Sequence, residues 1–458
     1  MKLWPTKIDS NEVEQNVWIA LFVILIIYFI SVVIALMQPG PTWKDLQVFT
    51  WMKSNAVYGL SFTKGYNISL QSAPIYTEVL FDEQHKVYVG MPPIFMIIGS
   101  VIYSFLGGHY ITARLVHVLF DILMFYSVFI FALRLFKPEI IVYVLFFTIS
   151  PMILIYATHQ DANTAQIGLS VLCYLCFINF LESKNMKWLI ATSILFFIGF
   201  WTTYLMFSIL PGMLLQLWYT KKFDFLLKRK GILILILIGT LSILSIITYL
   251  SFLPNGLDWL VYRFQVRLSD NIMPSGNYKG EIDIFKYVIW QLIKLITYFS
   301  PICIVLSILG VICLTKDNKR TINDSKKVFE NSNLLLQVLF VLFTWGIPFN
   351  LMINGAYNHS FSLYYFAPFF SFSSAIGLKY LTVEIKKDSL KKIVSAGILC
   401  FFILFSFSRS TLKISGGSLE HVLFYVSPEI PFAKNPNKNV NLNDKVISPD
   451  LWKKYTGE

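Results

Sequence analysis

Residues 92–107 read PPIFMIIGSVIYSFLG, and the way this stretch lies at a membrane decides the fold of the whole chain. It opens with Pro92 and Pro93, contains Gly99, and ends at Gly107. Its apolar part is about 14 residues long, whereas a helix that crosses a membrane needs ~20. Two prolines at its start also suit a helix that begins there better than one that continues from upstream. We therefore predict an interfacial or re-entrant helix that does not span the membrane.

The rest of the chain is apolar enough to be a multi-pass membrane protein. Of its 458 residues 56% are hydrophobic and 14% are charged, against roughly 25% charged in a soluble domain. Beyond 92–107, eleven stretches are long and apolar enough to span: 17–37, 110–135, 138–157, 163–182, 187–204, 204–219, 231–253, 291–314, 334–354, 361–382 and 393–409. The expected fold class is an all-α polytopic membrane protein with about eleven transmembrane helices.

The basic residues orient these helices. The net charge is +12, but Lys and Arg gather in short clusters between apolar runs, which is typical of membrane orientation and not of nucleic-acid binding. The clusters begin at Arg134, Lys184, Lys221, Lys316 and Lys386. With eleven spans all five fall on one side, which the positive-inside rule makes cytoplasmic. If 92–107 spanned, the N-terminus and the first loop would exchange sides.

This topology assigns residues to each face. We expect a cytoplasmic N-terminus and a membrane domain over residues 1–409. Its long extracytoplasmic loops are 38–108 and 254–290, and residues 410–458 form a short extracytoplasmic tail. The five cysteines all lie in apolar stretches, so no disulfide and no thiolate metal site is expected.

The first loop carries an acidic residue close to the first span. Residues 43–57 have apolar residues at helical spacing and predict an amphipathic helix along the membrane surface, with Asp45 near its start. A carboxylate there is either a catalytic group or a negative charge that interacts favourably with the helix dipole.

Two further polar groups interrupt the apolar pattern. Arg114, His117 and Asp121 lie on one helical face inside a predicted span, where ionisable groups either pair with each other or face a cavity. His117 and Asp121 are an i,i+4 pair. A polar turn with His159 and Asp161 follows the third span, where Asp161 is either a functional acid or a helix cap.

Arginines mark the second long outer loop. Arg263 and Arg267 have i,i+4 spacing, so both side chains project to one side of a helix. Guanidinium groups bind phosphate through two hydrogen bonds, which suits a lipid that carries a phosphate. Simple placement of long cationic side chains at the membrane surface is the alternative. No Gly-rich phosphate loop, HExxH motif or Ser/His/Asp pattern is present, and the acidic pair Glu281 and Asp283 is too weak a pattern to name a metal site.

Taken in chain order, these residues resemble the GT-C class of polyprenyl-phosphate-sugar-dependent glycosyltransferases. They are similar above all to protein O-mannosyltransferases and lipid A aminoarabinose transferases. The matching features are Asp45 after span one, Met91-Pro92-Pro93-Ile94, Leu106-Gly107-Gly108, Arg114-Leu115, Ser150-Pro151, Tyr156, His159-Gln160-Asp161 and Tyr365-Phe366-Ala367-Pro368. The resemblance covers about residues 40–220 best, and it also implies interfacial helices in the first outer loop.

The chain departs from the family pattern at three positions. Leu46 follows Asp45 where an acidic pair is common, Met91 precedes Pro-Pro where His or Lys is common, and Gln160 stands where a basic residue often precedes the acid. His85 and Lys86 lie a few residues upstream of Met91 and are candidates to substitute for the missing basic residue.

The resemblance implies an inverting transfer of a hexosyl or pentosyl group from a polyprenyl- or dolichyl-phosphate donor to an acceptor hydroxyl at the extracytoplasmic face. Asp45 is then the general base and Asp161 positions the acceptor or shares its proton. Arg263, Arg267 and Lys86 bind the donor phosphate. Supporting roles are expected for Arg114, His117, Asp121, His85, His159 and Tyr365. The acceptor is a lipid, a glycan or a protein, and the membrane is a bacterial inner membrane or an endoplasmic reticulum.

Two other functions fit the same sequence. The first is a flippase or transporter of lipid-linked sugars, which needs its functional charges inside the helix bundle, as at Arg114, His117 and Asp121. The second is an envelope polysaccharide polymerase or ligase, which needs more cations in a large outer loop. The sequence names no resident cofactor or metal site, and it leaves a divalent cation open.

Overall fold

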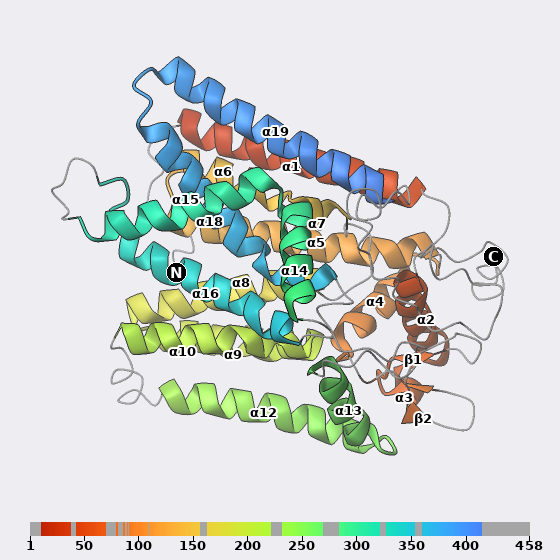
Figure 1. Ribbon diagram of the computed structural model, residues 1–458. Coiled ribbons are helices and arrows are strands. Elements are labelled where there is room, and N and C mark those ends of the chain that lie inside the picture. Colours follow the sequence, from red (N-terminus) through yellow and green to blue (C-terminus); the bar gives the residue numbers. More distant parts are fainter. Residues whose placement is uncertain are drawn as a thin grey trace.

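The computed structural model describes residues 11–37, 43–69, 79–80, 86–87, 89, 91–108, 110–155, 163–220, 231–268, 284–320, 327–352 and 360–414. Long helices lie side by side across most of this part of the chain (Figure 1). The expected all-α polytopic class is confirmed.

Seven helices in the described residues are long and apolar enough to cross a membrane. They are α1 (Asn11–Met37), α5 (Tyr110–Leu135), α8 (Asn163–Ser183), α12 (Gly231–Ser251), α15 (Pro301–Asn318), α16 (Ser332–Leu351) and α19 (Asp388–Ile414). Shorter helices occupy the other predicted spans: α6 (Pro138–Thr148), α7 (Pro151–Ile155), α9 (Met186–Thr202), η1 (Tyr204–Ser208), α10 (Ile209–Tyr219), η2 (Ser360–Phe366) and α18 (Ala367–Val383). The wide exposure of apolar side chains on α1 and α12 suits helices whose outer faces meet lipid.

One predicted span is wrong in its bounds. Residues 291–314 form two helices, because α14 (Ile284–Phe299) ends at Ser300 and α15 begins at Pro301. Ser300 has a φ of +70°, and its hydroxyl accepts a hydrogen bond from the Cys303 amide at 3.2 Å. Proline lacks the amide hydrogen that would continue α14 and suits the first position of a new helix. The apolar run therefore hides a sharp change of direction.

The first loop folds into short elements. They are α2 (Trp43–Tyr58), α3 (Leu60–Thr63), α4 (Ile94–Phe105) and the strands β1 (Ile68–Ser69), β2 (Val79–Leu80) and β3 (Lys86–Val87), which pair antiparallel in the order β1-β3-β2. α4 has 12 residues, or about 18 Å, whereas the hydrocarbon core of a membrane is ~30 Å thick. It packs against α2 so closely that a Cβ at Gly99 would lie 2.4 Å from the Met52 Cε. This arrangement agrees with the predicted interfacial helix.

The bundle has two chemically different ends. At the end that we call the loop end lie α2, α3, α4 and α13 (Gly256–Leu268), and at the opposite end lie the α8–α9 and α18–α19 turns (Figure 1). Ion pairs tie helix termini at this opposite end: Arg134 with Glu182, and Glu139 with Lys379 and Lys391. The second end therefore carries predicted cytoplasmic clusters, and we call it the basic end.

Candidate functional site

The residues predicted to act in catalysis, phosphate binding or support of the site are distributed over several elements. Asp45 is the third residue of α2, and Lys86 is the first residue of β3. Arg263 and Arg267 lie one turn apart in α13. His85, His159 and Asp161 lie outside the described residues. Arg114, His117 and Asp121 follow one another in the first half of α5, and Tyr365 lies in η2.

Two tyrosine hydroxyls dock the first loop onto the bundle, and an asparagine hydrogen bond holds the loop together. The Tyr66 hydroxyl donates to the Tyr249 carbonyl of α12 at 2.6 Å, and the Tyr204 hydroxyl of η1 donates to the Val89 carbonyl at 3.2 Å. The Asn67 amide donates to the Met91 carbonyl at 2.8 Å, just before the Pro-Pro start of α4. Burial raises the pKa of Tyr66 to about 12, so this hydroxyl keeps its proton and remains a donor at physiological pH.

An apolar cluster that includes Tyr66 joins this loop to α13. Tyr66, Ile68 and Val89 belong to a core against which Trp259 and Leu260 of α13 pack. Ile68 is paired with Val87, which is the neighbour of Lys86. Trp259 and Leu260 thus dock α13, which carries Arg263 and Arg267, against the loop whose β3 carries Lys86. All three predicted phosphate-binding cations lie on elements of one docked assembly.

A buried polar cluster connects α5 to α1 and α8. The Tyr28 hydroxyl donates to Asp121 Oδ2, and His117 Nε2 lies 3.4 Å from Asp121 Oδ1. Thr164 Oγ1 lies 3.3 Å from His117 Nε2. None of these four side chains is more than 1% exposed. The predicted pairing of His117 with Asp121 is confirmed, and it accords with the high cost of an unpartnered ionisable group in a membrane interior.

The buried cluster holds the beginning of α8. Thr164 is the second residue of that helix and follows Asp161 by three positions. On another side of α8 the Tyr365 hydroxyl donates to Gln166 Oε1 at 3.0 Å. The helix start that follows the polar turn is therefore held from α5 and from η2 at once. Arg114 is 8% exposed and lies one turn before His117, in the first turns of α5.

Two buried cations were missed in the sequence. Lys294 of α14 is 3% exposed, with its Nζ 5.3 Å from the Trp290 ring centroid, and Arg409 of α19 is 9% exposed. Both helices pack against α7, the helix that leads toward the polar turn at His159. The Ser300-Pro301 break is the sequence signal that would have found Lys294. A single span over 291–314 puts this lysine at the end of a helix, whereas a break at Ser300 puts it in the middle of a separate helix.

In the part of the chain that the structure describes, no three His, Cys, Asp or Glu side chains are grouped as metal ligands.

Solved structures share the fold. The crystal structure of ArnT from Cupriavidus metallidurans bound to undecaprenyl phosphate matches with a TM-score of 0.54 over 88% of this chain and 77% of that one, at 11% identity. A crystal structure of the Archaeoglobus fulgidus oligosaccharyltransferase in complex with Zn and sulfate matches with a TM-score of 0.51 over 86% of this chain, at 14% identity. This chain spans about half of the latter, 53% of its length.

Neither the protein-family models nor the curated proteins give a sequence match. At these identities the structural likeness establishes the fold, and the predicted resemblance to GT-C proteins is confirmed at that level.

Proposed function

We propose that this protein is a membrane glycosyltransferase that moves a sugar from a polyprenyl- or dolichyl-phosphate donor to an acceptor hydroxyl at the extracytoplasmic face. One observation carries the proposal: at the loop end, opposite the basic end (Figure 1), α2 and α4 of the first loop pack with Ala165 at the start of α8, and other residues of the same loop pack against α13. The fold likeness to a protein whose crystal structure holds undecaprenyl phosphate supports a lipid-phosphate carrier as the donor.

The reaction that this arrangement suits is a single displacement. The acceptor oxygen attacks the anomeric carbon, the bond from that carbon to the phosphate oxygen breaks, and the configuration inverts. Asp45 takes the proton of the acceptor hydroxyl, and the lipid phosphate leaves with the bonding electrons. Asp161 orients the acceptor.

Cations stabilise the leaving group. Negative charge grows on the phosphate as the bond breaks, so positive groups nearby favour the transition state more than the ground state. Arg263 and Arg267 supply that charge from α13, and Lys86 supplies it from β3. The packing of α13 against Tyr66, Ile68 and Val89 of the first loop, whose β3 pairs with β1 through Ile68 and Val87, supports this assignment.

The test is transfer by the purified full chain in lipid nanodiscs, supplied with a panel of hexosyl and pentosyl polyprenyl phosphates. The readout is release of polyprenyl phosphate, measured by mass spectrometry. Asp45→Asn removes the base and keeps the size of the side chain, so we expect a loss of at least ~100-fold, the low end for general-base catalysis. The control is Asp258→Asn, which neutralises an exposed carboxylate on α13 outside the proposed machinery. Equal rates for wild type and Asp45→Asn would refute Asp45 as the base.

A carrier of lipid-linked sugars is the second candidate, and the buried cluster of His117, Asp121 and Tyr28 favours it. The two functions separate when Asp121→Asn and Asp45→Asn are compared in a flipping assay with a fluorescent polyprenyl-phosphate analogue. A carrier loses flipping in the first variant alone, whereas a transferase shows no flipping to lose.

A further inference from the structure

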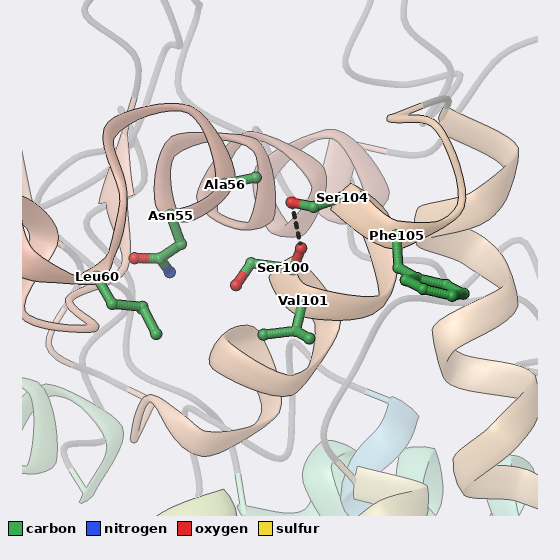
Figure 2. A pocket seen from close by; sticks show the side chains of 7 residues that line it. All are labelled: Asn55, Ala56, Leu60, Ser100, Val101, Ser104 and Phe105. Carbon is green, nitrogen blue, oxygen red and sulfur yellow. Dashed lines mark hydrogen bonds between the residues drawn. The ribbon is translucent and has the colours of Figure 1, made fainter.

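A hollow lies between α2 and α4, and nothing in the proposed reaction uses it. It has a volume of about 420 Å³, within the ~300–1,000 Å³ that is typical of small-ligand sites. Its inner polar group is Asn55, which is 2% exposed. Within the described part of the chain, neither the nitrogen nor the oxygen of its carboxamide has a hydrogen-bond partner. Figure 2 shows this carboxamide directed between the side chains of Leu60 and Ser100.

The unsatisfied amide defines what a ligand must offer. A carboxamide has two donor hydrogens and one acceptor oxygen, and buried polar atoms in proteins are nearly always paired. Ser100 and Ser104 also line the hollow, and their hydroxyls donate to the Ile97 and Ser100 carbonyls, both at 2.8 Å. Their oxygens remain able to accept. A ligand with several hydroxyl groups meets all of these requirements at once.

The remaining lining is apolar and uncharged. Leu60, Val101 and Phe105 are 42%, 57% and 89% exposed, and Ala56 completes the wall beside Asn55. No ionisable side chain is among the described lining residues, so nothing there would balance a phosphate or a carboxylate. Apolar walls with a few converging polar groups are the usual composition of a site for an uncharged small molecule.

We propose that this pocket binds an uncharged sugar ring, supplied either by a glycolipid headgroup or by a free glycan. The amide of Asn55 takes neighbouring ring hydroxyls as donor and acceptor, while Phe105 and Val101 contact the carbon face of the ring. Asn55 follows Asp45 by ten residues on α2, about 15 Å along the helix. A role as a distal subsite for a glycosylated acceptor rests on the proposed function, whereas the binding of the sugar does not.

The experiment is photocrosslinking of the full chain in nanodiscs, with the labelled peptides identified by mass spectrometry. One probe is a diazirine-bearing alkyl β-glucoside, and the other is a water-soluble diazirine glucoside without the alkyl chain. We expect label on the peptides that contain α2 and α4. Label from the alkyl probe alone assigns a glycolipid, and label from both assigns a free glycan.

Variants separate the pocket from the surrounding surface. Asn55→Leu has nearly the same size and no hydrogen-bonding groups in its side chain. We therefore expect labelling to fall about tenfold or more, which corresponds to a loss of ~1.4 kcal/mol of binding free energy. Ser104→Phe fills the exposed mouth and should block labelling even if Asn55→Leu folds poorly. The control is Ser54→Ala, a neighbouring buried residue on α2 that does not line the pocket. Wild-type labelling in both Asn55→Leu and Ser104→Phe overturns the proposal, and so does equal labelling by a diazirine alkylphosphocholine.

The crosslinking result tests the sugar pocket independently of the transfer assay. Asp45→Asn should keep wild-type crosslinking, because it leaves the pocket intact. Crosslinking without any transfer activity in wild type retains the sugar site and rejects the proposed function. Transfer activity without crosslinking rejects the sugar site alone.

Discussion

At the scale of single residues, the buried carboxyl group of Asp121 depends on partners from other segments of the chain. It is fully buried in α5, where Tyr28 comes from α1, His117 from one turn earlier, and Thr164 lies beyond His117 in α8. Each partner comes from a different segment, so the cluster joins three helices. Its members meet because a carboxylate in this environment needs donors and lipid has none to offer.

Tyr28→Phe tests this cluster at one hydroxyl. The change keeps the ring, which packs edge-on against Phe125 at 5.2 Å, and removes only the donor to Asp121. An acceptor left unpaired in a buried site costs about 1–3 kcal/mol, so we expect a lower thermal unfolding temperature in detergent. The matched control is Tyr126→Phe, whose side chain is 53% exposed on α5. Equal unfolding temperatures for the two variants would show that the Tyr28 hydroxyl contributes nothing.

At the scale of elements, small residues decide how closely helices approach. A Cβ on Gly377 of α18 would lie 2.0 Å from the Leu306 carbonyl oxygen, and one on Gly310 of α15 would lie 2.2 Å from the Ser373 carbonyl oxygen. Ser307, one turn before Gly310 on α15, shares a hydrogen bond with the Ser373 hydroxyl of α18 at 2.6 Å. Close backbone approach with serine hydroxyls across the interface is a common way for helices to associate in membranes.

Gly377→Ala should therefore separate α15 from α18. The obstructing atom is backbone and cannot rotate away, so we expect a destabilisation of about 1–3 kcal/mol, seen as earlier thermal unfolding. Gly239→Ala on α12 is the control, because a Cβ there meets nothing within 4 Å. That change should be neutral or stabilise the helix by up to about 1 kcal/mol. If both variants unfold alike, α15 and α18 are not in the contact described above.

Helix boundaries show the limits of pattern at this same scale. The amphipathic pattern over 43–57 predicted α2 to within a residue, because its apolar face has a single apolar core to meet. The stretch 291–314 is apolar on average, so hydropathy did not reveal that Ser300 turns the chain. The left-handed backbone at Ser300, followed by Pro301 as the first residue of the next helix, separates α14 from α15.

At the scale of the whole molecule, we predict that the basic end is cytoplasmic, and cysteine labelling on intact cells tests this orientation. In a variant without the five native cysteines, single cysteines replace Ser61 on α3, Gln265 on α13 and Ser183 at the end of α8, all of them exposed. With the basic end cytoplasmic, a membrane-impermeant thiol reagent should label the first two positions and spare Ser183 until the cells are opened. Labelling at Ser183 with protection at Ser61 would reverse the orientation and remove the extracytoplasmic site.

The sequence by itself determined the class of the protein and the positions of most helices, and it placed His117 and Asp121 on one helical face where they could pair. Hydropathy and charge act locally along the chain, so their periods and clusters can be counted in one dimension. It also predicted that residues 92–107 would not cross the membrane, from their length and from the two prolines at their start.

Only the tertiary structure decided which distant segments meet. The contact of Tyr28 with Asp121 joins residues 93 positions apart, and the bond from Tyr365 to Gln166 joins residues 199 apart. The unpaired amide of Asn55 looks in sequence like any polar residue on a surface helix. It became a candidate site because α4 buries it, and burial is a property of packing that no local pattern records.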